Sequence, residues 1–194
     1  MREALYIVGA PGAGKTTLSL ALREGWLGLD SRRPIAHTLY PDAGVVSLGR
    51  DREGFGGTDA LGMTAVVPAS AWVMEPEGEW DADQLMAEGD RLAVGRFIDA
   101  LDAGGWNITI AHLKTDPEVS ARRRAERADR LGASLQGASW VQGRETKVLN
   151  LVERYAGITV TLNGNLPTEA SVKQLADLSP VAHSLTRGLY GAPC

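Results

Sequence analysis

Hydrophobic positions along the chain form two kinds of pattern, short unbroken runs and longer stretches with helical spacing. Short apolar runs between turn residues predict buried strands, whereas apolar residues three and four apart predict helices with one buried face. Strands are therefore expected at residues 4–8, 35–40, 45–48, 84–87, 107–113 and 158–162. Helices are expected at residues 15–24, 69–74, 91–103, 116–131, 146–155 and 168–178. Strands that alternate with helices are typical of an α/β fold with a largely parallel sheet.

The connections between these elements differ in character. Pro41-Asp42-Ala43-Gly44 separates two of the apolar runs, and because Pro, Asp and Gly each favour turn geometry, a hairpin is expected there. Residues 49–59 are rich in glycine and polar groups, which makes them unsuited to a core. Residues 132–143 show no periodicity, so an irregular connection is expected before the helix at 146–155.

A glycine-rich loop directly follows the first predicted strand. Residues 9–16 read Gly-Ala-Pro-Gly-Ala-Gly-Lys-Thr, which is the pattern G-x-x-x-x-G-K-[ST]. The glycines let the backbone turn tightly, so that several N–H groups and the start of the next helix converge on phosphate oxygens. Lys15 is expected to reach the β- and γ-phosphates, and the Thr16 hydroxyl is expected to bind Mg²⁺. The predicted nucleotide-binding residues are Gly9, Ala10, Pro11, Gly12, Ala13, Gly14, Lys15, Thr16 and Thr17.

Length and composition limit the class of protein. A chain of 194 residues suits one domain and is long enough to bury a proper core. No apolar run is long enough to span a membrane, and the first strand begins too early to leave room for a signal peptide. The one cysteine, Cys194, excludes internal disulfides. A cytoplasmic protein without a membrane partner is therefore expected.

Charge is distributed unevenly along the chain. The net charge of −4 gives no general argument for nucleic-acid binding. Residues 75–90 contain seven acidic residues and neither Lys nor Arg, which is typical of a solvated surface. Residues 121–130 contain five arginines against two acidic residues, a local net charge of +3. Five arginines in ten residues project around most of a helix, so this segment is a candidate for anion binding.

An enzyme that transfers phosphoryl groups also needs an acid near Mg²⁺ and cations near the phosphates. Glu88 directly follows the predicted strand at 84–87, and the carboxyl end of a parallel strand lies at the edge of the sheet where ligands bind. Glu88 is therefore predicted to hold Mg²⁺ through water, and Arg91 is predicted to face the phosphates. The alternative is that both belong to an ordinary acidic start of a helix.

The arginine-rich helix and the loop after it suit a mobile lid, because guanidinium groups bind phosphate oxygens in pairs. The alternative is a solvated helix in which Glu126 and Asp129 pair with two or three of the arginines. Arg144 and Lys147 lie at the start of the next predicted helix, where the helix dipole disfavours cations. Their position there indicates a bound anion.

Four residues are predicted to line the side of the site that holds the phosphoryl acceptor. Phe55 is expected to stack on a base, with ordinary packing as the alternative. Asp59 is expected to accept a hydroxyl proton or a base N–H. The complete set is Arg50, Phe55, Thr58 and Asp59.

Three further motifs follow the phosphate loop in a recognisable order. They are Phe55-Gly-Gly-Thr-Asp-Ala-Leu-Gly-Met63, Glu88-Gly-Asp-Arg-Leu92 and Trp140-Val-Gln-Gly-Arg-Glu-Thr-Lys-Val-Leu-Asn-Leu151. Together with the loop, they resemble the P-loop kinases of tailed bacteriophages over about residues 4–162. These kinases are close to nucleoside monophosphate kinases in fold. Some of them phosphorylate the 5-hydroxymethyl group of hydroxymethyluracil in phage DNA, a step toward hypermodified thymidines.

The resemblance implies a single P-loop kinase domain over residues 1–194, with a parallel core of about five strands flanked by helices. It places an acceptor-binding insertion at about residues 30–80 and an arginine-rich lid at about residues 116–150. It also implies roles for individual side chains. ATP and Mg²⁺ would contact Lys15 and Thr16, the transfer site would contain Glu88 and Arg91, and Asp59 would lie on the acceptor side. The lid cations would be Arg122, Arg127, Arg144 and Lys147.

The sequence thus predicts an ATP- and Mg²⁺-dependent kinase of nucleotide-like acceptors, with hydroxymethyluracil in DNA as the leading acceptor. A deoxynucleoside monophosphate is the alternative, because the chain is acidic overall and only the predicted lid is basic. A P-loop ATPase or GTPase that transfers to water is the alternative from another class. The chain has no strand that ends in Asp-Asp or Asp-Glu and no N-K-x-D motif, which counts against it. The oligomeric state stays open.

Overall fold

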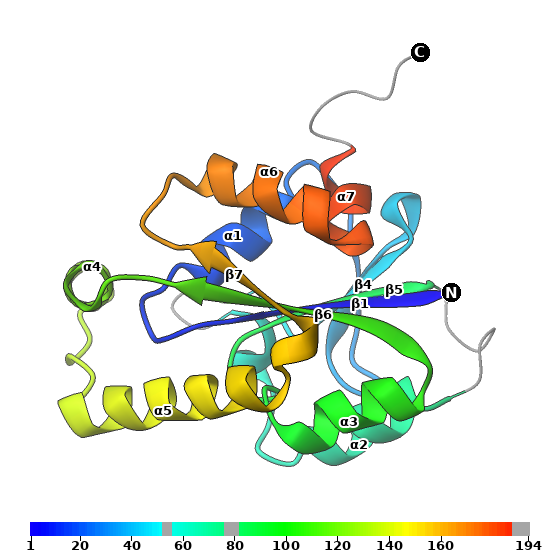
Figure 1. Cartoon of the computed structure of the whole chain (residues 1–194), viewed down its shortest axis with the longest axis horizontal. Coiled ribbons are helices and arrows are strands. Elements are labelled where there is room, and N and C mark those ends of the chain that lie inside the picture. The colour runs from blue at the N-terminus through cyan, green and yellow to red at the C-terminus, as the bar shows by residue number, and fades with distance from the viewer. Residues whose placement is uncertain (52–55, 76–81, 188–194) are drawn as a thin grey trace.

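The computed structural model describes residues 1–51, 56–75 and 82–187, and these residues form a seven-stranded sheet with helices on both faces (Figure 1). The strands are β1 (Arg2–Val8), β2 (Leu29–Ser31), β3 (His37–Tyr40), β4 (Val45–Leu48), β5 (Gln84–Glu88), β6 (Trp106–Lys114) and β7 (Thr159–Asn163). The α-helices are α1 (Lys15–Leu22), α2 (Val66–Val73), α3 (Gly95–Ala103), α4 (Pro117–Arg130), α5 (Ala138–Arg154), α6 (Thr168–Leu178) and α7 (Pro180–Thr186). Short 3₁₀ helices are η1 (Pro41–Ala43), η2 (Gly57–Ala60) and η3 (Ala156–Ile158).

The strands follow the order β2-β3-β4-β5-β1-β6-β7 across the sheet. The five strands from β4 to β7 in this order are parallel, whereas β3 and β2 extend the edge in antiparallel pairing. The prediction of an α/β fold with about five parallel strands is therefore confirmed. The expected hairpin joins β3 to β4 through η1. Strand β2 was not expected, because Leu29 is its one apolar residue.

The central position of β1 in the sheet explains why its sequence is an uninterrupted apolar run. Its residues alternate between the two faces of the sheet, and both faces are covered. Leu5 and Ile7 pack into the core beneath α1, α6 and α7, whereas Tyr6 and Val8 pack into the core beneath α2, α3 and α5. The loop that follows β1 is consequently held at the middle of the carboxyl edge of the sheet.

The helix predicted at 146–155 begins earlier than expected, at Ala138. Gly137, in an extended conformation, is its N-cap, and Val141, Val148 and Leu151 give it a buried stripe. The irregular region predicted at 132–143 is therefore helical in its second half. Gly143 misled the sequence interpretation because a glycine inside a helix is tolerated where packing supplies the stability.

Other boundaries differ by smaller amounts. Helix α3 begins at Gly95 rather than at residue 91, since Gly89 (φ 107°) turns the chain away from the sheet first. Helix α2 begins at Val66 rather than at residue 69, and α7 was not expected at all. Within the part of the chain that the structure describes, no helix combines the length and apolar character required to cross a membrane.

Candidate active site

The phosphate loop connects β1 to α1 and ends at Gly14, the N-cap of that helix. Gly14 has a φ of 99°, a left-handed conformation that favours glycine. The Lys15 Nζ donates hydrogen bonds to the carbonyl oxygens of Gly9 (2.9 Å) and Ala10 (3.2 Å), which hold its ammonium group over the loop. Burial lowers the pKa of Lys15, and the nearby Glu88 opposes that shift. The charge of Lys15 is thus poorly solvated, which favours its pairing with an anion.

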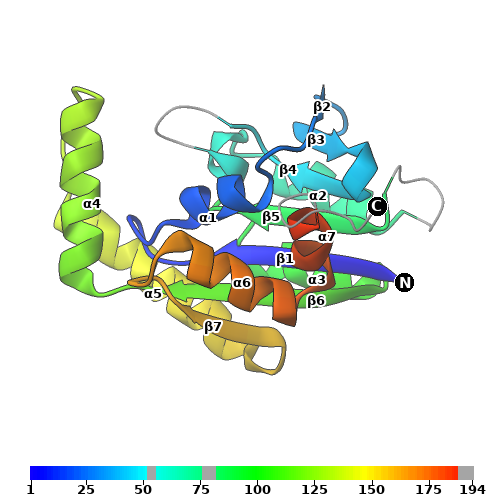
Figure 2. The same ribbon diagram turned by 90° about the horizontal axis from the view of Figure 1, so that it is seen from above.

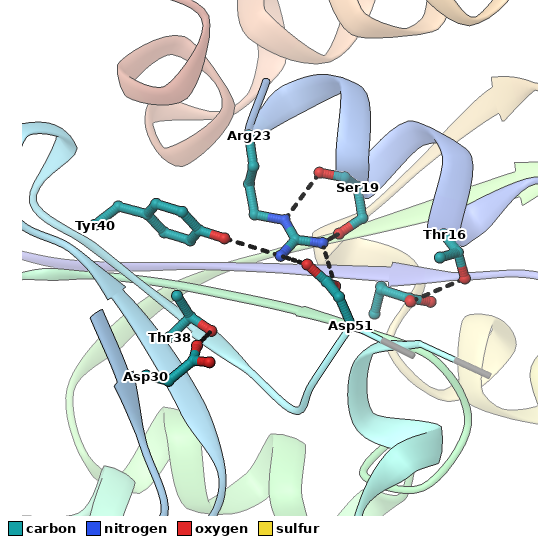
Figure 3. Close-up of polar contacts among 8 residues, drawn as sticks. Thr16, Ser19, Arg23, Asp30, Thr38, Tyr40 and Asp51 are labelled. Carbon is teal, nitrogen blue, oxygen red and sulfur yellow. Dashed lines mark hydrogen bonds and ion pairs between the residues drawn. The ribbon is translucent and has the colours of Figure 1, made fainter. Parts of the chain in front are cut away.

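Thr16 and Glu88 meet as predicted at the carboxyl edge of the sheet. Glu88 is the last residue of β5, the strand beside β1, and the Thr16 hydroxyl donates to its Oε1 at 3.0 Å (Figure 3). Glu88 is only 3% exposed, and this burial raises its pKa. A carboxylate and a hydroxyl side by side are oxygen ligands that suit Mg²⁺, and a cation there would compensate the buried charge. The residues present therefore fit the ion predicted for this position.

Helix η2 carries Asp59 against the end of β5. The Asp59 Oδ1 accepts a hydrogen bond from the backbone N–H of Asp90 at 2.7 Å, which holds the carboxylate beside Glu88. This close approach requires Gly57, because a Cβ at that position would lie 2.5 Å from the Glu88 Oε1. Gly57 also has a φ of 59°, so a side chain there would be strained as well as crowded.

The remaining residues predicted on the acceptor side lie in different places. Thr58 is completely buried, with its Oγ1 3.3 Å from the Tyr6 hydroxyl. It therefore anchors η2 to the core and does not line the site. Arg50 is half-buried, and its backbone N–H donates to the Gly57 carbonyl at 3.1 Å. Phe55 lies outside the described residues.

The Asp90 carboxylate forms ion pairs with two cations of α5. Arg144 forms an ion pair with its carboxylate, and the Lys147 Nζ lies 3.0 Å from Oδ1 while donating to the Asp90 carbonyl at 2.7 Å. Burial, together with the neighbouring Arg144, lowers the pKa of Lys147 to about 8. Both cations lie within α5, so the prediction that they stand at a helix start was wrong. Asp90 positions them, and its place in the Glu88-Gly-Asp-Arg motif was the signal available in the sequence.

Arg91 lies in the same region, and its guanidinium has no strong hydrogen-bond acceptor among the described residues. Its Nη1 donates to the sulfur of Met63, a weak acceptor, and its Nε is buried without a hydrogen-bond partner among the described residues. A buried guanidinium N–H without a strong acceptor costs free energy. The chemistry of Arg91 therefore suits an incoming anion, and its predicted contact with phosphate stays a prediction.

Helix α4 stands across the carboxyl end of the sheet, beyond the ends of β1 and β6 (Figure 2). Its arginines project in different directions. Arg123 donates to the Ala13 and Gly164 carbonyls at 3.2 and 3.1 Å, and Arg124 donates to the Pro11 carbonyl at 2.8 Å. These bonds fasten the helix to the phosphate loop.

Arg127 and Arg122, predicted together as lid cations, are separated by the geometry of α4. Arg127 lines the cavity above the loop, where its Nη2 lies 3.5 Å from the Gln136 Oε1. The Arg122 side chain is 68% exposed and pairs with Glu126 at 3.8 Å. Five residues along a helix correspond to a rotation of about 140°, so the two side chains cannot face the same cavity. The structure does not bring Arg122 to the site.

Among the described residues, at least three cavities lie beside the phosphate loop. One opens between α1 and α4, with Leu20, Arg123 and Arg130 in its lining, and the other two are called the first and the second cavity. The first joins the loop to η2, to the end of β5 and to helices α4 and α5. It is lined by Gly9, Pro11, Gly12, Lys15, Thr16, Gly56, Asp59, Asp90, Arg91, Arg127, Gln136, Trp140, Arg144 and Val148. The second lies on the side of the loop toward β6 and α6, and its lining includes Gly14, Thr17, Arg123, Gly164 and Leu166. Of these last residues, only Gly14 and Thr17 were predicted.

A model of the family described as P-loop Nucleotide Kinase3 matches residues 1–166 of the chain. The chain belongs to the P-loop Nucleotide Kinase3 family. Membership supports nucleotide binding and phosphoryl transfer, and kinases of this kind generally use ATP and Mg²⁺. No curated protein matches the chain.

In this P-loop kinase a buried polar network stands behind the loop helix, and no motif in the sequence pointed to it. Arg23, at the end of α1, is 7% exposed. Its guanidinium donates to both carboxylate oxygens of Asp51 at 3.0 Å, to the Tyr40 hydroxyl at 3.0 Å, and to Ser19 (Figure 3). The network ties the helix that carries Thr16 to β3 and to the segment that leads toward η2.

Proposed function

We propose that the chain transfers the γ-phosphoryl group of ATP, with Mg²⁺, to a hydroxyl group of a nucleotide-like acceptor. The observation that carries this proposal is the first cavity. It is lined by Lys15 and Thr16 of the phosphate loop, by Asp59 and Arg91, and by cations from α4 and α5. An ATPase needs no acceptor site, whereas a kinase needs a cavity of this kind on the far side of the transferred group.

The first and second cavities suit the two substrates. The attacking and leaving oxygens lie roughly in line at the phosphorus, so donor and acceptor approach from opposite sides of the phosphate loop. The second cavity, between Arg123 and Leu166, would hold the nucleoside of ATP. The first cavity, beside Asp59 and Arg91, would hold the acceptor.

The proposed transfer divides the work among the residues of the first cavity. The acceptor oxygen forms a bond to the γ-phosphorus while the bond to the β,γ-bridging oxygen breaks, and ADP departs with the electron pair. Lys15 and Arg127 stabilise the negative charge on the transferred group. Thr16 and Glu88 would hold Mg²⁺, which neutralises phosphate charge when bound. Asp59 receives the acceptor's hydroxyl proton, because Glu88 is already engaged by Thr16.

Hydroxymethyluracil in DNA is the leading acceptor in this proposal. Its support is the resemblance carried by the motifs at 55–63, 88–92 and 140–151, together with the exposed Arg122 and Arg130 of α4. A free deoxynucleoside monophosphate is the second candidate, and in that case an oxygen of its 5′-phosphate, rather than a hydroxyl group, would attack the γ-phosphorus. It is favoured by the net charge of −4 and by the position of Arg91, Arg144 and Lys147, which are gathered at one point rather than along a stripe.

A side-by-side transfer assay separates the two acceptors. Radiolabelled γ-phosphate of ATP is offered with a hydroxymethyluracil oligonucleotide or with free deoxynucleoside monophosphates, at low and at moderate salt. If DNA is the acceptor, we expect labelled oligonucleotide and a kcat/KM that falls steeply with salt, because salt screens the many contacts to the DNA backbone. Labelled monophosphate with a shallow salt dependence would favour the second candidate. Label in inorganic phosphate alone, at the same rate with and without acceptors, would contradict both.

A further inference from the structure

One large aromatic side chain of the first cavity belongs neither to the core nor to the phosphate machinery. Trp140 lies in the first turn of α5 and lines the cavity together with Lys15 and Asp59. The residue is 42% exposed, while the buried side of α5 is formed by Val141, Val148 and Leu151. Packing of the helix therefore does not account for an indole at this position.

The indole is held in place from the catalytic side of the cavity. The Arg144 guanidinium lies over the Trp140 ring, 5.1 Å from its centroid, and the same guanidinium pairs with Asp90. Asp90 in turn donates its backbone N–H to Asp59 at 2.7 Å. A cation over an aromatic face is attractive, and here the cation is itself anchored. The orientation of the ring is thus coupled to the position of the proposed base.

We propose that Trp140 is the stacking surface for the nucleobase of the acceptor, and that Arg144 positions its ring. This inference rests on the proposed function. A base presents a flat aromatic face, and stacking on an indole recognises that face without regard to hydrogen-bonding pattern. The base of ATP is assigned to the second cavity, across the loop near Arg123 and Leu166, and Trp140 lines the first cavity, which is assigned to the acceptor.

The test combines a change in the protein with a change in the ligand. Binding to Trp140→Leu, Trp140→Phe and wild type is measured by calorimetry with a non-hydrolysable ATP analogue present. The probes are thymidine monophosphate against deoxyribose 5-phosphate, and a hydroxymethyluracil oligonucleotide against the same oligonucleotide with an abasic site. Leu149→Ala is the matched control, because Leu149 is 58% exposed on the same helix and is not among the described residues of the cavity.

For the probe that binds, Trp140→Leu is expected to weaken the form with a base by roughly 5- to 150-fold. The form without the base should change little, Trp140→Phe should retain most of the affinity, and Leu149→Ala should match wild type. Circular dichroism checks that each variant folds. Equal weakening of both forms would mean that Trp140 only shapes the cavity, and weakened binding of the ATP analogue would place the donor base there. Either result overturns the inference.

The transfer assay distinguishes this failure from failure of the proposed function. If wild type phosphorylates an acceptor while Trp140→Leu keeps the same acceptor KM, the stacking role is wrong and the kinase assignment stands. If wild type neither binds nor phosphorylates any of the probes, the proposed function fails and the inference fails with it.

Discussion

At the scale of single residues, burial decides the chemistry of the charged groups beside the phosphate loop. Glu88 is 3% exposed and carries a raised pKa, while burial lowers the pKa values of Lys15 and Lys147. Each of these shifts disfavours the charged form, as expected when a group leaves water. Mg²⁺ at Glu88 and phosphates at the two lysines would compensate these charges. Keeping these three residues charged therefore costs more free energy in the free protein than in its complex with Mg²⁺ and phosphates.

Glu88→Gln is expected to separate function from stability. The variant keeps the shape of the side chain but loses the charge proposed to hold Mg²⁺, so kcat should fall by about 10- to 100-fold. Because ionising a buried carboxyl group opposes folding at neutral pH, the melting temperature should stay the same or rise. Steady-state kinetics with a Mg²⁺ titration and thermal unfolding test both parts. A lower melting temperature with unchanged kinetics would assign Glu88 a structural role.

Lys147 predicts a pH dependence. Its charge is present below its pKa of about 8 and is lost above it, so kcat/KM for an anionic acceptor should fall as the pH passes through about 8. Lys147→Arg should move this fall to higher pH, because arginine stays charged. The free energy of unfolding should rise with pH between about 8 and 10.5, where the unfolded chain binds one more proton than the folded one. The same pH profile in wild type and Lys147→Arg would contradict the assignment.

At the scale of elements, α4 and α1 show how one segment serves two purposes. Helix α4 is fastened to the loop by Arg123 and Arg124, turns Arg127 toward the cavity and leaves Arg122 in solvent. Helix α1 presents Thr16 to the site at its start. At its end it is tied to Asp51 through Arg23. In α4 the angular position of an arginine decides its role, and in α1 the two ends of the helix have different roles.

Arg127→Gln and Arg122→Gln form a matched pair on α4. Arg127 faces the proposed transfer site, so its loss should lower kcat by about 10²- to 10³-fold with little effect on ATP binding. Arg122 lies on another face, and its loss should leave kcat within about twofold of wild type. Steady-state kinetics of the two variants decide the matter. Similar losses for both would mean that α4 acts through its overall charge.

Asp51→Asn probes the network behind the loop helix. The change leaves the buried Arg23 guanidinium without its ion pair, which should lower the free energy of unfolding by about 1–3 kcal/mol. Asp30→Asn is the control, because Asp30 accepts from Thr38 in an exposed pair of the neighbouring strands (Figure 3). That control should change stability by less than about 0.5 kcal/mol. Urea unfolding measures the free energy of unfolding of both variants. Equal losses would show that the buried network stabilises the protein no more than the exposed Asp30–Thr38 pair does.

At the scale of the whole molecule, the fold extends past the residues that define the family. The family model matches residues 1–166, whereas α6 and α7 occupy residues 168–186 and cover one face of the sheet (Figure 1). Val172, Leu175, Val181 and Leu185 are between 0 and 3% exposed and pack against Leu5 and Leu22. Burial of side chains of this size contributes about 1.5–3 kcal/mol each.

A chain that ends at Leu166 is therefore expected to lose its cooperative unfolding transition. The four buried side chains together account for roughly 6–12 kcal/mol, which is comparable to the whole stability of a typical domain of about 5–15 kcal/mol. A chain that ends at Arg187 keeps all of these contacts and should unfold cooperatively. Circular dichroism during thermal unfolding compares the two. A sharp transition in the shorter chain would show that residues 1–166 fold alone.

The sequence by itself determined the features that depend on neighbouring residues. The phosphate loop, the strand before it and the carboxyl-end position of Glu88 follow from local patterns, because a parallel strand buried on both faces is apolar throughout and its end lies at the ligand edge. The α/β class and the five parallel strands follow from the alternation of the elements. These predictions were confirmed.

Only the tertiary structure decided which side chains meet. Arg122 and Arg127 are alike in sequence and differ by their angle on α4. Trp140 and Arg144 lie four residues apart on α5, whereas Asp90 follows β5, and the ion pair between Arg144 and Asp90 exists only when β5 and α5 are placed together. Arg23 resembles any surface arginine until the strands bring Asp51 and Tyr40 to it. Local pattern reports burial and secondary structure, whereas contacts between distant segments depend on packing, which a single sequence does not display.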